Sequence, residues 1–190
     1  MAGDVRDRMV EGAMGLLARR GLQATSFSEV LAATGAPRGS LYHHFPEGKD
    51  QLVAAAVDRA GAVLTDAMEP VAGAPAQAVV ERFLAIWRAV LSRSQCEAGC
   101  AVLAVTVATD SAELLSHATA VFRAWRERLA ELLELGGLGA DQARRFAMVL
   151  IASAEGAVVL SRADQSLEPF EAVAQQLLAQ LRGLGADAQA

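Results

Sequence analysis

The chain has 190 residues, of which 53% are hydrophobic and 5% aromatic, and its formal net charge is −5. Few aromatic residues and abundant alanine favour closely packed helices over a β-sandwich. The negative total charge excludes binding to nucleic acid through overall charge, so any such contact must be local. The N-terminus lacks an apolar signal core and no apolar run reaches the roughly 18 residues of a membrane span. We therefore expect a cytoplasmic protein without membrane contact.

Hydrophobic periodicity predicts three helices near the N-terminus. The first covers about residues 4–20, with acids at its start and bases at its end, which complements the helix dipole. The second opens at Ser26, which is predicted to form a capping box with Glu29. After a break at a glycine, a short third helix covers about residues 37–44 and carries proline in its first turn.

The rest of the chain shows the same helical periodicity. Residues 69–75 are rich in Pro, Gly and Ala and are predicted to be a linker. No segment has the alternation of a strand with hairpin signals, so the predicted fold class is all-α. The further helices are expected over about residues 49–68, 76–94, 111–135, 141–163 (capped by Asp141) and 168–182, with a short apolar stretch at 101–108.

Residues 26–49 have the pattern of a helix-turn-helix, in which the second helix enters the major groove of DNA. Leu41 and Phe45 are one helical turn apart and are predicted to bury against Val30 and Leu17, which would fix the short helix. The opposite face of the short helix carries Arg38, Gly39, Ser40, Tyr42, His43 and His44.

The residue types on this face suit contact with a duplex. Gly39 lets the backbone approach closely, and Arg38, Ser40 and Tyr42 are phosphate-binding types. The two histidine rings reach phosphates or base edges. Alternatively, Tyr42 packs under the short helix and the histidines are solvated surface. Neither histidine has a cysteine or carboxylate at metal-ligand spacing, so we expect no metal.

Positions 26–45, from Ser26 to Phe45, resemble the DNA-binding signature of the TetR family, with Leu-Tyr-x-x-Phe followed by Lys-x-x-Leu. The resemblance implies that Tyr42, Ser40 and Lys49 touch phosphates. It also implies that Arg38, Gly39 and His43 face bases, and Ser26 and His44 complete the candidate DNA-binding set.

One spacing departs from the usual family pattern. Three residues separate Phe45 from Lys49, where the family usually has two, which leaves the reach of Lys49 open. The sequence Phe-Pro-x-Gly-Lys is similar to the LmrA/YxaF-like branch of the family. Gly99 and Cys100 before an apolar helix resemble the same branch.

The helix expected over residues 141–163 is apolar nearly all round, so it must be buried on both sides. One side would face the domain interior and the other a partner subunit. With the last helix it would form an intersubunit four-helix bundle, as the resemblance also implies. The expected homodimer interface comprises Ala152, Gly156, Val159, Leu160, Phe170, Val173 and Leu177.

Aromatic residues at helical spacing are usually core, yet the C-terminal helices carry enough apolar surface for a ligand pocket. Glu155 interrupts an apolar run, where a buried carboxylate is costly unless paired. It either hydrogen-bonds a ligand or pairs with an arginine across the dimer. The candidate pocket for a hydrophobic or amphipathic effector comprises Phe83, Trp87, Phe122, Trp125, Met148 and Glu155.

Cys96 and Cys100 are too few for a metal site or a disulfide framework. Free cysteine is among the most buried residue types, so a structural role is expected. Redox sensing is the alternative.

Together these observations predict a dimeric transcriptional repressor that binds a palindromic operator and is released by a small effector. The expected organisation is a DNA-binding head at 1–48, a connecting helix at 49–70 that acts as a lever, and a ligand-binding and dimerisation domain at 71–190. The alternative is an activator, or a DNA-binding factor without a ligand. No nucleophile–base pair, metal cluster or phosphate-binding glycine loop indicates an enzyme, and no cofactor is expected.

Overall fold

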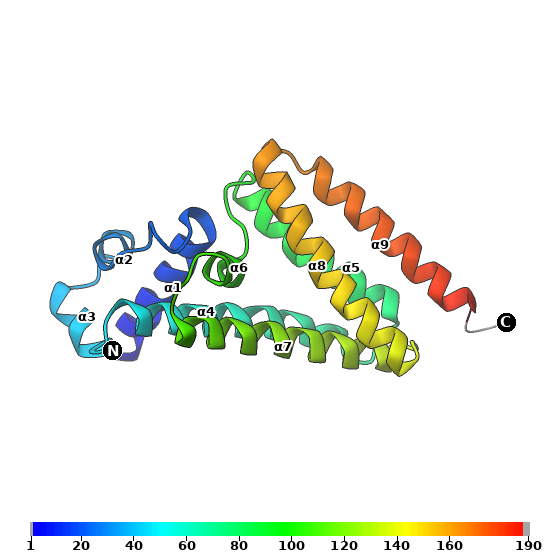
Figure 1. Ribbon diagram of the computed structural model, residues 1–190, viewed down its shortest axis with the longest axis horizontal. Helices are drawn as coiled ribbons and strands as arrows, with labels where there is room; N and C mark the ends of the chain where they lie inside the picture. The colour runs from blue at the N-terminus through cyan, green and yellow to red at the C-terminus, as the bar shows by residue number, and fades with distance from the viewer. Residues whose placement is uncertain (1, 188–190) are drawn as a thin grey trace. The chain divides into compact units, whose positions relative to one another are not determined.

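The computed structural model describes residues 2–187, within which the chain forms helices and no strand, as the all-α prediction requires (Figure 1). The second, third and sixth α-helices are short, with 8, 7 and 6 residues, whereas each of the other α-helices has at least 18 residues. In chain order the elements are α1 (Ala2–Arg20), α2 (Phe27–Thr34), α3 (Arg38–His44), α4 (Lys49–Met68), the 3-10 turn η1 (Glu69–Val71), α5 (Ala76–Arg93), α6 (Ala101–Thr106), α7 (Ala112–Leu135), α8 (Ala140–Asp164) and α9 (Glu168–Asp187).

Most helix bounds agree closely with the prediction from periodicity. The observed bounds of α4 are the expected residues 49–68, and the expected linker after it contains the single turn η1. The prediction that Asp141 caps α8 was wrong. Gly139 is the N-cap, and the carboxylate of Asp141 pairs with Arg144 one turn further along the helix. Helix α9 extends five residues beyond its expected end at residue 182.

The chain forms two compact units that are interleaved in sequence. One contains the residues up to Val63 together with Cys100–Phe122, and the other contains Leu64–Gly99 and the residues from Arg123 onward. Two of the three boundaries fall inside α4 and α7, so each of these helices continues from one unit into the other. The third lies between Gly99 and Cys100, just before α6. The domains expected from the sequence, at 1–48, 49–70 and 71–190, are consecutive stretches of chain and do not coincide with these two units. The functions assigned to those three stretches stay a prediction.

In the first unit, α1 packs against α2, α3 and α6. The side chains of Met9, Ala13 and Leu17 on α1 are fully buried, as are Val30 on α2 and Val53 on α4. This small core supports the loops and short helices of the N-terminal region.

In the second unit, α5, α8 and α9 pack against one another. The guanidinium of Arg88 on α5 donates two hydrogen bonds to Glu171 on α9, at 2.5 and 2.8 Å. These bonds lower the pKa of the Glu171 carboxyl below its ordinary value. The same guanidinium lies 5.8 Å from the ring centroid of the buried Phe170, so α9 is attached to α5 by charge and by packing.

Helix α8 is the one described helix that is long and apolar enough to cross a membrane by length and composition. Half of its most apolar stretch is buried inside the fold. Core helices of soluble proteins have this property, so the finding is weak support for a membrane span.

Gly136, which follows the last residue of α7, is a packing constraint in the second unit. Its carbonyl accepts a hydrogen bond of 3.0 Å from the Ala76 N–H at the start of α5. A Cβ at this position would lie 2.5 Å from that nitrogen and 2.8 Å from the Ala74 oxygen. Both are backbone atoms, which cannot rotate away.

We therefore expect Gly136→Ala to lower the free energy of unfolding by about 1–3 kcal/mol, as overpacking does. Urea unfolding followed by circular dichroism measures the change. Gly15→Ala is the matched control, because the Cβ would enter open space in α1; it should be neutral or stabilise by up to about 1 kcal/mol. Equal stability of Gly136→Ala and the wild type would contradict this account of the junction.

Candidate nucleic-acid interface

Helix α2, which lies between α1 and α3 in the chain, is held by a cap at each end and by one ion pair. The hydroxyl of Ser26 accepts a hydrogen bond of 3.2 Å from the Glu29 N–H, which confirms the predicted N-cap. Gly35 ends α2 with φ +64°, a left-handed conformation that favours glycine. The Glu29 carboxylate, expected to complete the capping box, instead accepts a hydrogen bond of 2.7 Å from Arg20. Glu29 therefore ties α2 to the end of α1.

Helix α3 is anchored by one buried face. Leu41 is 1% exposed and Phe45 is fully buried, as are Leu17 and Val30, which confirms the predicted burial of all four. Pro37 is the extended N-cap of α3, and the Phe45 N–H closes its last turn on the Leu41 carbonyl at 2.8 Å. The opposite face is thereby turned to solvent.

Tyr42 is on this outer face and is 71% exposed. Its ring meets that of Phe27 edge to face, with centroids 6.2 Å apart and an interplanar angle of 77°. This contact positions the ring from the side, and the high exposure excludes the alternative in which Tyr42 packs beneath α3.

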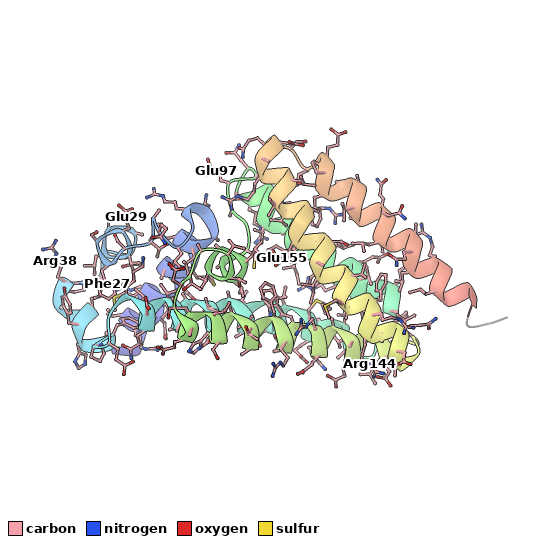
Figure 2. The ribbon with its side chains drawn as sticks, in the orientation of Figure 1. Phe27, Glu29, Arg38, Glu97, Arg144 and Glu155 are labelled. Atoms are coloured by element: carbon pink, nitrogen blue, oxygen red, sulfur yellow. The ribbon has the colours of Figure 1, made fainter. Side chains whose placement is uncertain are left out.

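The other candidates on α3 differ in accessibility. Arg38 is exposed and points away from the ribbon (Figure 2), and a Cβ on Gly39 would enter open space, with no atom within 4 Å. Ser40 and His44 are half-buried, whereas His43 is exposed. The rings of His43 and His44 are 5.0 Å apart. Among the described residues there is no group of three metal-ligating side chains.

Lys49 is the first residue of α4, and its ammonium donates a hydrogen bond of 3.0 Å to the carbonyl of Leu22. This contact holds it against the loop between α1 and α2. An ammonium has three N–H donors, so two are left for another acceptor. The phosphate contact expected for Lys49 stays a prediction.

The candidate effector residues fall into three groups. Phe83, Trp87 and Trp125 are buried in the second unit, and Glu155 there is 7% exposed. Phe122 belongs to the first unit and is half-buried.

Met148 does not lie in the interior, contrary to expectation. It is 51% exposed, and its sulfur is 3.9 Å from a guanidinium nitrogen of Arg126. Periodicity did not place it correctly because α8 is apolar on more than one face.

The residues expected at a dimer interface fall into an exposed group on α8 and a mostly buried group on α9. Ala152, Gly156, Val159 and Leu160 are exposed on α8. Phe170 and Leu177 are instead buried within the chain itself, and Val173 is half-buried, so the interface expected on α9 was wrong at Phe170 and Leu177. The ring of Phe170 contacts the guanidinium of Arg88, and the hydroxyl of Ser161 accepts a hydrogen bond from the Phe170 N–H.

Cys96 and Cys100 are buried and are not joined by a disulfide. Cys100 is the N-cap of α6, and its sulfur accepts a hydrogen bond of 3.3 Å from the Leu103 N–H. This contact gives Cys100 a structural function.

Comparison with known proteins agrees with this architecture. Residues 9–56 match the family described as bacterial regulatory proteins, tetR family, and residues 75–176 match the C-terminal domain of LmrA/YxaF-like transcriptional regulators. The chain belongs to the TetR family. It is therefore a DNA-binding transcriptional regulator and not an enzyme.

Relatives of this TetR-family regulator match along most of their length. An uncharacterized HTH-type transcriptional regulator of Mycobacterium tuberculosis is 34% identical over 179 residues, covering 90% of this chain and 91% of the relative. LmrA of Bacillus subtilis, an HTH-type transcriptional regulator, is 27% identical, with coverage of 88% and 92%. A TetR regulator structure from Chloroflexus aurantiacus is 28% identical, with a TM-score of 0.77 and coverage of 95% and 96%.

In a TetR-family regulator the helix-turn-helix binds DNA, which assigns that function to α2 and α3. The branch expected from the spacing between Phe45 and Lys49 is also confirmed by the LmrA/YxaF-like match. The individual DNA contacts on α3 stay predictions of the geometry.

Tyr42→Phe removes only the phenol oxygen and leaves the ring on Phe27. Because hydrogen bonds to charged groups contribute about 1.5–3 kcal/mol each, we expect operator affinity to fall about tenfold or more. Fluorescence anisotropy with labelled duplex measures it. Thermal unfolding should be unchanged, since the ring is exposed. Wild-type affinity of Tyr42→Phe would rule out the phosphate contact through this hydroxyl.

Proposed function

We propose that this regulator is a cytoplasmic repressor that binds a palindromic operator as a homodimer and is released by a small hydrophobic or amphipathic effector. The observation that carries the proposal is the two-sided character of α3. Leu41 anchors one face, and Arg38, Tyr42 and His43 stand exposed on the other. A helix held in this way presents its polar side to the major groove.

An exposed apolar stripe on α8 supports the dimer. Its members recur at the spacing of one helical face, and large exposed apolar patches on soluble proteins mark interaction sites. Small residues in the stripe permit close approach of a second helix. The stripe comprises Met148, Val149, Ala152, Gly156, Val159 and Leu160.

A buried indole supports an effector with a hydrogen-bond acceptor. Trp87 is 5% exposed, and its Nε1–H has no hydrogen-bond partner within the described part of the chain. Buried donors in proteins are nearly always satisfied, so an unsatisfied one needs an explanation. An acceptor oxygen or nitrogen on an otherwise apolar effector would satisfy it.

Contacts between α4 and α7 support the proposal that effector binding in the second unit acts on the DNA-binding helices through both α4 and α7. His117 Nδ1 on α7 lies 3.0 Å from Asp58 Oδ1 on α4. One turn further along, a Cβ on Gly61 would lie 2.9 Å from a methyl of Val121, so the glycine permits close packing. Both contacts lie just before the points where α4 and α7 pass into the second unit. An effector bound in the second unit would act on α3 through two coupled helices, in place of the single lever expected from the sequence.

Selection of duplexes from a random-sequence library tests the operator and the effector together. The proposal predicts enrichment of an inverted repeat with half-sites about 10 base pairs apart, or a multiple of that spacing. Footprinting on the enriched duplex should weaken when fractionated small molecules from a cell extract are added. An unchanged footprint favours the alternative of a regulator without an effector, and a footprint that strengthens would contradict release by the effector.

Val159→Glu places a charge on the α8 stripe and is expected to convert the dimer to a monomer, because an unpaired charge in an apolar interface is costly. Analytical ultracentrifugation measures the state, and operator affinity should fall with it. Leu135→Glu is the matched control, since Leu135 is 61% exposed and belongs to α7 and not to the α8 stripe; it should remain dimeric. A dimeric Val159→Glu variant would show that another surface mediates association.

A further inference from the structure

Arg6 on α1 is seated on a residue that follows the recognition helix. Its guanidinium carbon lies 5.5 Å from the centroid of the Phe45 ring. Arg6 is exposed, whereas Phe45 is fully buried and is the C-cap of α3. The ring of Phe45 therefore holds the exposed guanidinium of Arg6 next to the C-terminal end of α3. Because Arg6 and Phe45 are far apart in the sequence, no local motif indicates this contact.

Three other cations of the first unit are engaged by protein acceptors. Arg20 pairs with Glu29 at 2.7 Å, Arg59 pairs with Glu11 at 3.4 Å, and Lys49 donates to a backbone carbonyl. For Arg6, by contrast, no carboxylate lies within ion-pair distance among residues 5–184. A guanidinium stacked on a ring keeps the N–H donors along its edge available, and that edge suits the geometry of a phosphate.

Arg6 and Arg38 stand at the two ends of α3. Arg38 is its first residue, and Arg6 rests on Phe45, directly after its last residue, His44. Seven residues at about 1.5 Å each make α3 roughly 10 Å long. The major groove is about 12 Å wide and is bordered on both sides by phosphates. Cations at both ends of this helix are therefore spaced for phosphates beside one groove.

We propose that Arg6 is a DNA-backbone contact, positioned by the ring of Phe45, and that it adds to the helix-turn-helix a phosphate clamp from α1. The inference rests on the DNA-binding function and adds a residue outside the recognised motif. In a chain with net charge −5, binding depends on such local cations.

The test compares Arg6→Gln with Arg8→Gln in the full-length protein. Arg8 is also exposed and lies two residues along α1, so it points in another direction, and both variants change the charge equally. The probe is a duplex of about 30 base pairs enriched by the wild type from a random library, long enough for two half-sites. Affinity is measured across a series of salt concentrations, and circular dichroism checks the fold.

Each phosphate contact contributes about 0.9 to the slope of log affinity against log salt, so losing Arg6 from both protomers should reduce the slope by about two. Arg8→Gln should keep the wild-type slope. If the slope is unchanged for Arg6→Gln, Arg6 only covers Phe45 and the inference is overturned. Equal reductions for both variants would also overturn it, since they would reflect net charge alone. A wild type that enriches no duplex would instead refute the DNA-binding function itself.

Discussion

Burial of Leu41 and Phe45 is the constraint on which the DNA-reading surface depends. A helix of seven residues is too short to be stable alone in water, because too few hydrogen bonds offset the cost of nucleation. Packing onto the core that contains Leu17 and Val30 supplies that stability. Since the anchored residues occupy one face, the direction of the opposite face is determined, and Tyr42 is carried outward with it.

The N-terminal helices were predictable because their signals are local. Ser26 as an N-cap, glycine after α2 and proline before α3 each act within a few residues, and the observed bounds follow them. Contacts between distant segments had no such signal. The Arg6–Phe45 stacking and the Lys49–Leu22 hydrogen bond join residues that only the tertiary fold brings together.

Helix α8 shows a second limit of prediction from the sequence, which concerns the direction in which a helix face points. Its apolar residues extend nearly all round, so periodicity indicates burial without telling which face packs inside the chain. Met148 was expected inside and is exposed, while Phe170 on α9 was expected at an interface and is buried. The interleaved units have a similar cause, because the assignment of α6 and the start of α7 to the first unit depends on tertiary contacts.

The central claim is that the outer face of α3 meets the duplex. Tyr42 is the only tyrosine in the chain and is 71% exposed, so hydroxyl-radical oxidation read by mass spectrometry reports on it directly. Bound to its selected duplex, the protein should show strongly reduced oxidation at Tyr42, with oxidation at the exposed Leu135 unchanged. Undiminished oxidation of Tyr42 in a saturated complex would contradict the account.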